Sequence, residues 1–216
     1  MYGKLGLGNL KYNQYPQSIT YLNKHYCIKV VTGIEHSVVL TNKGKVFTFG
    51  NNNLGQLGIN NNQNYVKIPT QILHSKKFDN IYANYNFTII STEINEIFSF
   101  GDNKFGKLGI NNKIIKHTSF PYQLLKPIKT FIKNIYMGKN NCFLLSDDGN
   151  VYLLGLNPYT KYEYHIPKKI NYLDNYNVID ILIKDDNYVV FHLIDNKLQE
   201  ILLYDNYNNQ GKQIII

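Results

Sequence analysis

The chain has 216 residues, a formal net charge of +8 and 44% hydrophobic residues, with 19 Tyr and 11 Phe. This length suits a single domain of ordinary size, and its aromatic residues can build a core. The first residues do not resemble a signal peptide, and no apolar run approaches the ~20 residues that a membrane span needs. We therefore expect an intracellular protein of the cytoplasm or nucleus that is not secreted and has no transmembrane segment.

A glycine-rich phrase of nine residues occurs twice, at residues 50–58 and 101–109, and residues 2–6 match its end. The equivalent glycines are 52 and then 51 residues apart: Gly3, Gly55 and Gly106. A repeat of this length indicates a repeat architecture, in which each unit packs on its neighbours.

Short runs of β-branched and aromatic residues precede each phrase, separated by Gly, Asn and Asp. Such runs predict strands and turns. In chain order they occupy residues 30–50, 81–101, 135–155 and, in a degenerate form, 181–204. Tight hairpins are predicted at residues 42–44 and 147–149, where Gly supplies a positive φ, and Asn95 takes the place of that glycine in the second unit.

The predicted fold class is all-β, with β-propeller blades of about 51–54 residues and four antiparallel strands per blade. We expect one repeat domain over residues 1–216, an incomplete or open propeller arc. Its predicted repeat units are residues 1–58, 59–109, 110–157 and the degenerate 158–216.

The sequence of residues 33–58, which contains His36-Ser37 and ends in Gly55-Gln56-Leu57-Gly58, resembles the repeat of the regulator of chromosome condensation (RCC1) family. The resemblance is strongest over residues 30–58, covers most of the chain and is weakest after residue 178. It implies a propeller, and structural roles for the motif residues Gly33, His36, Ser37, Gly44, Gly50, Gly55, Gly58, Gly101, Gly106, Gly109, Gly138, Gly149 and Gly155.

The chain departs from the family pattern in several ways. It has no Trp, its His-Ser pair occurs once, and it holds about four units where the family usually has seven. An open arc would leave two strand edges unpaired. Because Met1 falls inside a motif, we expect a fragment of a larger propeller protein. The alternatives are an arc completed by a partner or second copy, and an arc that folds poorly.

Catalysis is not expected. His36 fits a hydrogen bond that braces a turn, because neighbouring strand residues point to opposite faces and cannot form a triad. The other histidines and the two cysteines, Cys27 and Cys142, lack metal-ligand spacing. The phrase at residues 50–58 lacks the Gly-Lys-Ser/Thr ending of a phosphate loop. We predict no catalytic, cofactor-binding or metal-binding residue, and no cofactor.

The basic residues are all Lys, and eight of them fall where no acidic residue intervenes, between Asp102 and Asp147. This basic segment comprises Lys104, Lys107, Lys113, Lys116, Lys126, Lys129, Lys133 and Lys139. It could bind phosphates through counterion release, but a bias of the genome toward A and T is the favoured explanation of the lysines. Without Arg, bidentate guanine contacts are absent and sequence preference would be weak.

The leading functional hypothesis is a non-catalytic protein–protein interaction module, a scaffold or regulatory subunit whose partner is unknown. Its expected binding surface is the most variable part of each unit, at residues 59–80, 110–130 and 156–178. The first alternative, implied by the resemblance, is guanine-nucleotide exchange on a small GTPase. The second is chromatin or nucleic-acid association through the basic segment.

Overall fold

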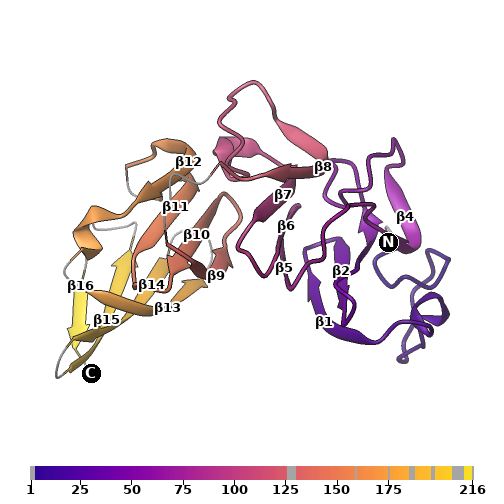
Figure 1. The fold of residues 1–216 in the computed structure, drawn as a ribbon, viewed down its shortest axis with the longest axis horizontal. Helices are drawn as coiled ribbons and strands as arrows, with labels where there is room; N and C mark the ends of the chain where they lie inside the picture. The colour runs from indigo at the N-terminus through magenta and orange to yellow at the C-terminus, as the bar shows by residue number, and fades with distance from the viewer. Residues whose placement is uncertain are drawn as a thin grey trace. The chain divides into compact units, whose positions relative to one another are not determined.

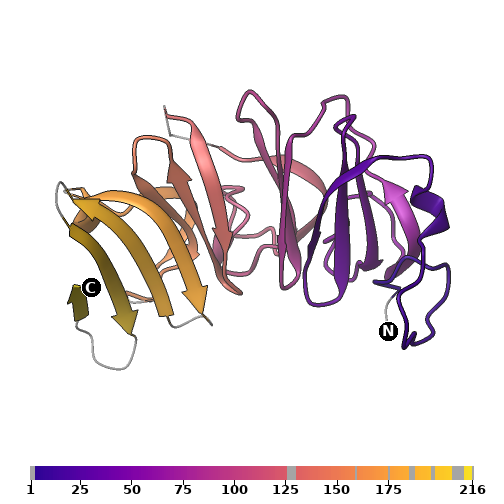
Figure 2. The same cartoon turned by 90° about the horizontal axis from the view of Figure 1, so that it is seen from below.

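The computed structural model describes residues 3–125, 130–158, 160–174, 176–184, 188–195, 198–205 and 212–215. These residues form four antiparallel sheets of four strands each, and the strands of each sheet are consecutive in the chain (Figure 1 and Figure 2). The all-β prediction and the four-stranded blade are confirmed.

The strand bounds follow the predicted runs, which held three strands each, and give the location of the predicted fourth strand. The first sheet contains β1 (Cys27–Thr32), β2 (His36–Thr41), β3 (Val46–Asn51) and β4 (Tyr65–Gln71). The second contains β5 (Asn80–Asn84), β6 (Phe87–Ser91), β7 (Ile97–Asp102) and β8 (His117–Gln123). The third contains β9 (Ile132–Met137), β10 (Asn141–Ser146), β11 (Val151–Leu156) and β12 (Glu163–Lys169). The fourth contains β13 (Asn177–Lys184), β14 (Tyr188–Asp195), β15 (Leu198–Asp205) and β16 (Lys212–Ile215). Three 3₁₀ turns complete the described elements: η1 (Thr20–Leu22), η2 (Lys104–Gly106) and η3 (Asn171–Leu173).

The chain forms two compact units. The first unit comprises Met1–Asn103 and Ile114–Leu124, with the first and second sheets. The second unit comprises Lys104–Lys113 and Leu125–Ile216, with the third and fourth sheets. The predicted repeat boundaries at residues 58, 109 and 157 fall between the third and fourth strands of a sheet.

The hairpins between the second and third strands form where the turn residues predict them. Gly44, Asn95 and Gly149 have φ values of 72°, 62° and 76°. Their amides donate to the carbonyls of Thr41, Thr92 and Ser146. Asn95 shows that a short amide side chain replaces glycine in this left-handed position.

Each unit has its own apolar core between two sheets. In the first unit, Val38, Leu40 and Val46 of the first sheet pack with residues that precede or belong to the second sheet, which are Phe78, Ile81, Ile90, Phe98 and Phe100. In the second unit, Phe143, Leu145 and Val151 of the third sheet pack with residues that precede or belong to the fourth sheet, which are Ile170, Leu173, Val178, Ile181, Val189 and Phe191. The side chains of successive residues in one strand therefore point to opposite faces of the sheet.

The phrase at residues 50–58 carries the chain from the first sheet onto the second and back to β4. A Cβ on Gly55 would lie 2.4 Å from the Thr118 carbonyl oxygen, and one on Gly58 would lie 2.7 Å from the Phe100 ring. The Thr48 hydroxyl donates to the Leu57 carbonyl at 2.7 Å and holds the returning loop. The phrase is thus a structural connection between sheets, and its glycines permit backbone to lie directly against a neighbour.

Two features require glycine at position 50. Its φ is 112°, and a Cβ there would lie 2.4 Å from the Glu35 carbonyl oxygen. Gly8 also has a positive φ, 79°, but a Cβ there would have its nearest neighbour at 3.7 Å. We expect Gly8→Ala to lower the free energy of unfolding by about 1–2 kcal/mol, the cost of the left-handed backbone.

Gly50→Ala adds a clash with backbone, so we expect a loss of about 3 kcal/mol or more. Urea unfolding of both variants measures the difference. Equal losses would show that close approach is not what fixes this glycine.

Candidate functional site

His36 links the two sheets of the first unit. It begins β2, is fully buried, and its Nε2 lies 2.9 Å from the hydroxyl oxygen of Thr88 in β6. The Thr88 hydroxyl donates its one proton to the Gln56 carbonyl at 2.8 Å. Nε2 of His36 must therefore carry the proton and donate to the Thr88 hydroxyl oxygen. Nδ1 is then unprotonated and can only accept a hydrogen bond.

No hydrogen-bond partner for His36 Nδ1 occurs within the described residues. Gly33 packs against this side of the ring, since a Cβ there would lie 2.2 Å from it. Burial lowers the pKa of His36 to about 4, because the charged ring would lose its hydration. A neutral, enclosed imidazole of this kind holds strands together and offers no accessible base.

A hydroxyl that holds the glycine-rich phrase recurs at the second residue of β2 and of β6. Ser37 donates to the Lys4 carbonyl at 2.8 Å, as Thr88 does to Gln56, and Lys4 and Gln56 both follow the equivalent glycine of their phrase. Cys142 stands at this place in β10, fully buried, and burial raises the pKa of its thiol. The Ser of the repeat motif is therefore a clamp on the phrase.

We did not predict a role for Asn52 and Asn103, although Asn occupies the third place of both phrases. The Asn52 amide nitrogen donates to the Gln63 carbonyl at 3.0 Å, and its oxygen accepts from the Leu57 amide at 3.2 Å. Asn103 donates to the Ile115 carbonyl at 2.7 Å. Both side chains are buried. The recurrence of Asn beside the repeated glycines was the available signal.

One lysine of the basic segment is buried, and those that the structure describes divide between the two units. Lys107 is only 1% exposed, and its Nζ donates to the Lys139 carbonyl at 2.8 Å. Lys104 lies over the Phe105 ring, 4.9 Å from its centroid. Lys116 belongs to the first unit, whereas Lys113 belongs to the second.

Of the remaining lysines of the basic segment, Lys133 and Lys139 are exposed. Lys126 and Lys129 lie outside the described residues. Lys107 therefore belongs to the core of the second unit and cannot take part in a phosphate-binding surface.

A groove with a volume of about 650 Å³ runs along β4 in the first unit. Its lining comprises Gly8, Asn62, Gln63, Asn64, Tyr65, Val66, Lys67, Ile68 and Thr70. The amides come from the loop that returns from the phrase, while Tyr65 and Ile68 come from the strand and are partly exposed. These lining residues combine amides with apolar and aromatic side chains, a mixture suited to binding.

The long segments predicted as a binding surface each contain a fourth strand. Residues 59–80 hold β4, residues 110–130 hold β8, and residues 156–178 hold β12. Large apolar side chains are exposed on or beside these strands in the first unit, including Leu73 at 89% and Phe120 at 50%. Within the groove lining itself, Tyr65 and Ile68 are exposed, which makes the groove along β4 the candidate interaction site.

No group of three His, Cys, Asp or Glu side chains in the described parts of the chain is arranged to hold a metal ion. No helix in those parts is long and apolar enough to cross a membrane.

Comparison with known proteins agrees with the repeat pattern. The model of the regulator of chromosome condensation (RCC1) repeat matches residues 1–40 and 43–90, and a second RCC1 repeat model matches residues 27–56. The human probable E3 ubiquitin-protein ligase HERC4 is 32% identical over 158 residues, which is 72% of this chain and 15% of that protein. The bovine secretion-regulating guanine nucleotide exchange factor is 36% identical over 111 residues, 50% of this chain and 24% of that protein.

The crystal structure of human WBSCR16 has the same fold, with a TM-score of 0.78 at 16% sequence identity. The aligned region covers all of this chain and 60% of that one. This chain therefore spans less than a quarter of the two curated relatives, and only its fold is shown by the structural likeness.

The pKa of His36 predicts a pH dependence of stability. The unfolded ring binds a proton below about pH 6.5 and the folded one only below about pH 4, so stability falls as the pH falls between these values. We expect His36 to contribute a loss of up to about 3 kcal/mol over this range.

The variant His36→Phe, which introduces the residue type that Phe87 supplies at the equivalent place of β6, removes this titration. Urea unfolding at pH 7 and pH 4.5 should therefore show a smaller pH difference for the variant than for the native chain. The same pH difference in both proteins would contradict a buried neutral His36.

Proposed function

The chain is an RCC1-like repeat protein, and from this we propose that it is a non-catalytic protein-interaction module that binds a partner protein along β4 of the first unit. The observation that carries the proposal is the groove beside β4, together with the exposed side chains of Tyr65 and Ile68 that line it. The partner chemistry that fits is an extended segment with apolar side chains. The Asn and Gln amides can bind its main chain, and Tyr65 and Ile68 can contact its side chains.

The position of β4 supports this mode of binding. It is the last strand of the first sheet, so one of its edges has no neighbouring strand within that sheet. Pro69 and Lys67 lie on it, and residues of these types discourage continuous strand pairing at an edge. Recognition by side chains in the groove is accordingly favoured over addition of a long strand.

The proposal is tested by Ile68→Asp, with Ile166→Asp as the matched control. Ile68 precedes Pro69 in β4 as Ile166 precedes Pro167 in β12, and the two are 36% and 40% exposed. We expect Ile68→Asp to weaken binding of the native partner at least ten-fold, because an anion would replace an apolar contact.

The partner is recovered from source cells with the native chain, identified by mass spectrometry and then titrated against each variant. Equal affinity for native chain and Ile68→Asp would refute the site. A partner that Ile166→Asp loses instead would place binding on the second unit.

Guanine-nucleotide exchange is the second candidate, because one relative is named as an exchange factor. We expect the chain alone not to accelerate release of fluorescent GDP from a panel of small GTPases, since it spans 24% of that relative. A ten-fold acceleration with any GTPase would replace the binding-module proposal. Nucleic-acid association has less support, because Lys107 is buried and Lys116 lies in a different unit from Lys104.

A further inference from the structure

Each of the first three fourth strands carries a proline followed three residues later by Ile or Leu. These pairs are Pro69 and Ile72, Pro121 and Leu124, and Pro167 and Ile170. Each proline lies where the register between third and fourth strand shifts, and a residue without an N–H suits such a bulge. The amide of each Ile or Leu donates to the first residue of the third strand, namely Val46, Ile97 and Val151.

A fourth copy of this pattern, Pro16-Gln17-Ser18-Ile19, belongs to no sheet. It nevertheless lies where a fourth strand of a preceding blade would lie. Ile19 and Leu22 pack against Val39, Phe47 and Phe49 of the first sheet. In the same way Ile72 packs against the second sheet, at the equivalent Ile90, Phe98 and Phe100.

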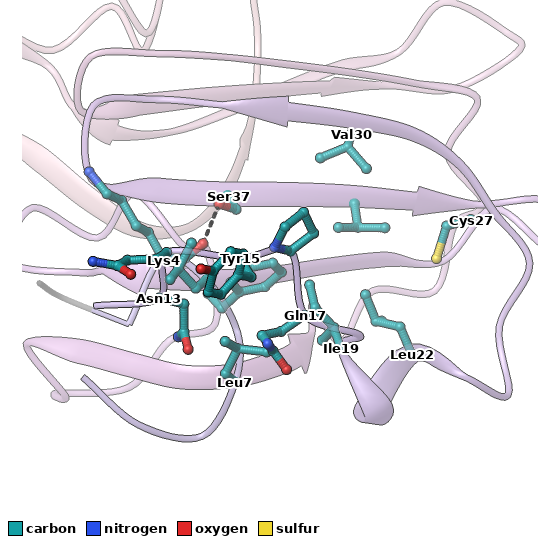
Figure 3. A pocket seen from close by; sticks show the side chains of 15 residues that line it. Lys4, Leu7, Asn13, Tyr15, Gln17, Ile19, Leu22, Cys27, Val30 and Ser37 are labelled. Carbon is teal, nitrogen blue, oxygen red and sulfur yellow. Dashed lines mark hydrogen bonds between the residues drawn. The ribbon is translucent and has the colours of Figure 1, made fainter. Parts of the chain in front are cut away.

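The segment around Pro16 leaves a cavity of about 580 Å³ against the first sheet (Figure 3). Apolar side chains dominate its lining, among them Leu5, Leu7, Tyr15, Ile19, Val30 and Val39. Val30 is 60% exposed, whereas Ile81, its counterpart opposite Ile90, is fully buried. The Asn13 amide nitrogen is buried without a hydrogen-bond partner within the described residues. This face of the first sheet is therefore shaped to pack against a further sheet, in which residues 13–19 would be the last strand.

The fourth sheet differs from the other three in its last strand. β16 has four residues where β4, β8 and β12 have seven, contains no proline, and pairs with β15 in unbroken register. The first three sheets thus end in a proline-bearing strand, and the fourth sheet does not. The proline-bearing segment at residues 16–19 is left without a sheet.

We propose that residues 13–19 pair with β15 of a second copy of this chain and take the place of β16 there. In the third sheet, Tyr152 is opposite the residue before Ile170, and in the first sheet Phe47 is opposite the residue before Ile72. Leu202 is the equivalent position in β15, since it pairs with Phe191 as Phe47 pairs with Val39. The same register places Ser18 opposite Leu202, and Gln17 opposite Leu203.

The distribution of charge along the chain favours a second copy as the source of the strands that pair with residues 13–19. Four lysines precede Glu35 with no acidic residue among them: Lys4, Lys11, Lys24 and Lys29. After residue 170 the balance reverses, with seven acidic residues and three lysines. A basic first part therefore meets an acidic last part of another molecule. Two copies would supply eight sheets, within the range of about four to eight blades found in propellers.

Cysteine cross-linking tests the register directly. In a Cys27→Ser background, which removes the exposed thiol, Ser18→Cys is combined with Leu202→Cys. Oppositely placed residues on paired strands bring their Cβ atoms close enough for a disulfide. We expect oxidation to convert most of the chain into a covalent dimer on a non-reducing gel, and each single variant to remain largely uncross-linked.

The register control is Gln17→Cys with Leu202→Cys, whose side chains would face opposite sides of the sheet and should not cross-link. A cross-linked monomer would overturn the second copy as the source of the strands, and no cross-link in any pairing would overturn the proposed strand.

Sedimentation of the native chain gives an independent readout. We expect a species of twice 25.1 kDa that dissociates as salt is raised. Val30→Asp should weaken this dimer at least ten-fold, while Ile94→Asp, at a still more exposed apolar position of the first unit, should not. A monomer at all concentrations would contradict the proposal.

Discussion

The architecture depends on one constraint: a loop must leave its own sheet, lie directly against the next and return. Backbone of the phrase at residues 50–58 approaches β8 and Phe100 so closely that a Cβ at Gly55 or Gly58 would overlap them. Once the loop is in place, its inward carbonyl at Gln56 must be satisfied, and the Thr88 hydroxyl does so. The buried histidine then donates to the same hydroxyl. In the first unit, glycine, hydroxyl and imidazole thus stabilise one connection in succession.

The constraint explains which substitutions the repeat tolerates. Phe87 replaces His36 in the second sheet, so this position can lose its hydrogen bond, whereas Asn141 takes its place in the third and donates to the Leu156 carbonyl. The glycine near the end of the third strand is retained in the first three sheets, at Gly50, Gly101 and Gly155, where a Cβ would meet backbone within 3 Å, and Asp205 takes this place in the fourth. Backbone crowding is therefore more restrictive than any single hydrogen bond in the repeat.

The sequence was sufficient to predict the first three strands of each sheet, because alternating apolar residues and Gly or Asn turns are local signals. It was not sufficient for the fourth strands, since β4 reads Tyr65–Gln71 with Pro69 in its middle and resembles a loop. The burial of Lys107 was also hidden, because its aliphatic stem and amine are placed by a distant carbonyl at Lys139. The groove along β4 could not be predicted, as it depends on Gly8 lying beside residues 62–70.

Hydrogen exchange of the native chain, read by mass spectrometry, tests most directly whether the phrase is part of the fold. We expect the amides of residues 55–58 to exchange as slowly as those of β6, because loop and strand open together. Fast exchange of residues 55–58 with β6 still protected would contradict it, and would reduce the phrase to an ordinary surface loop.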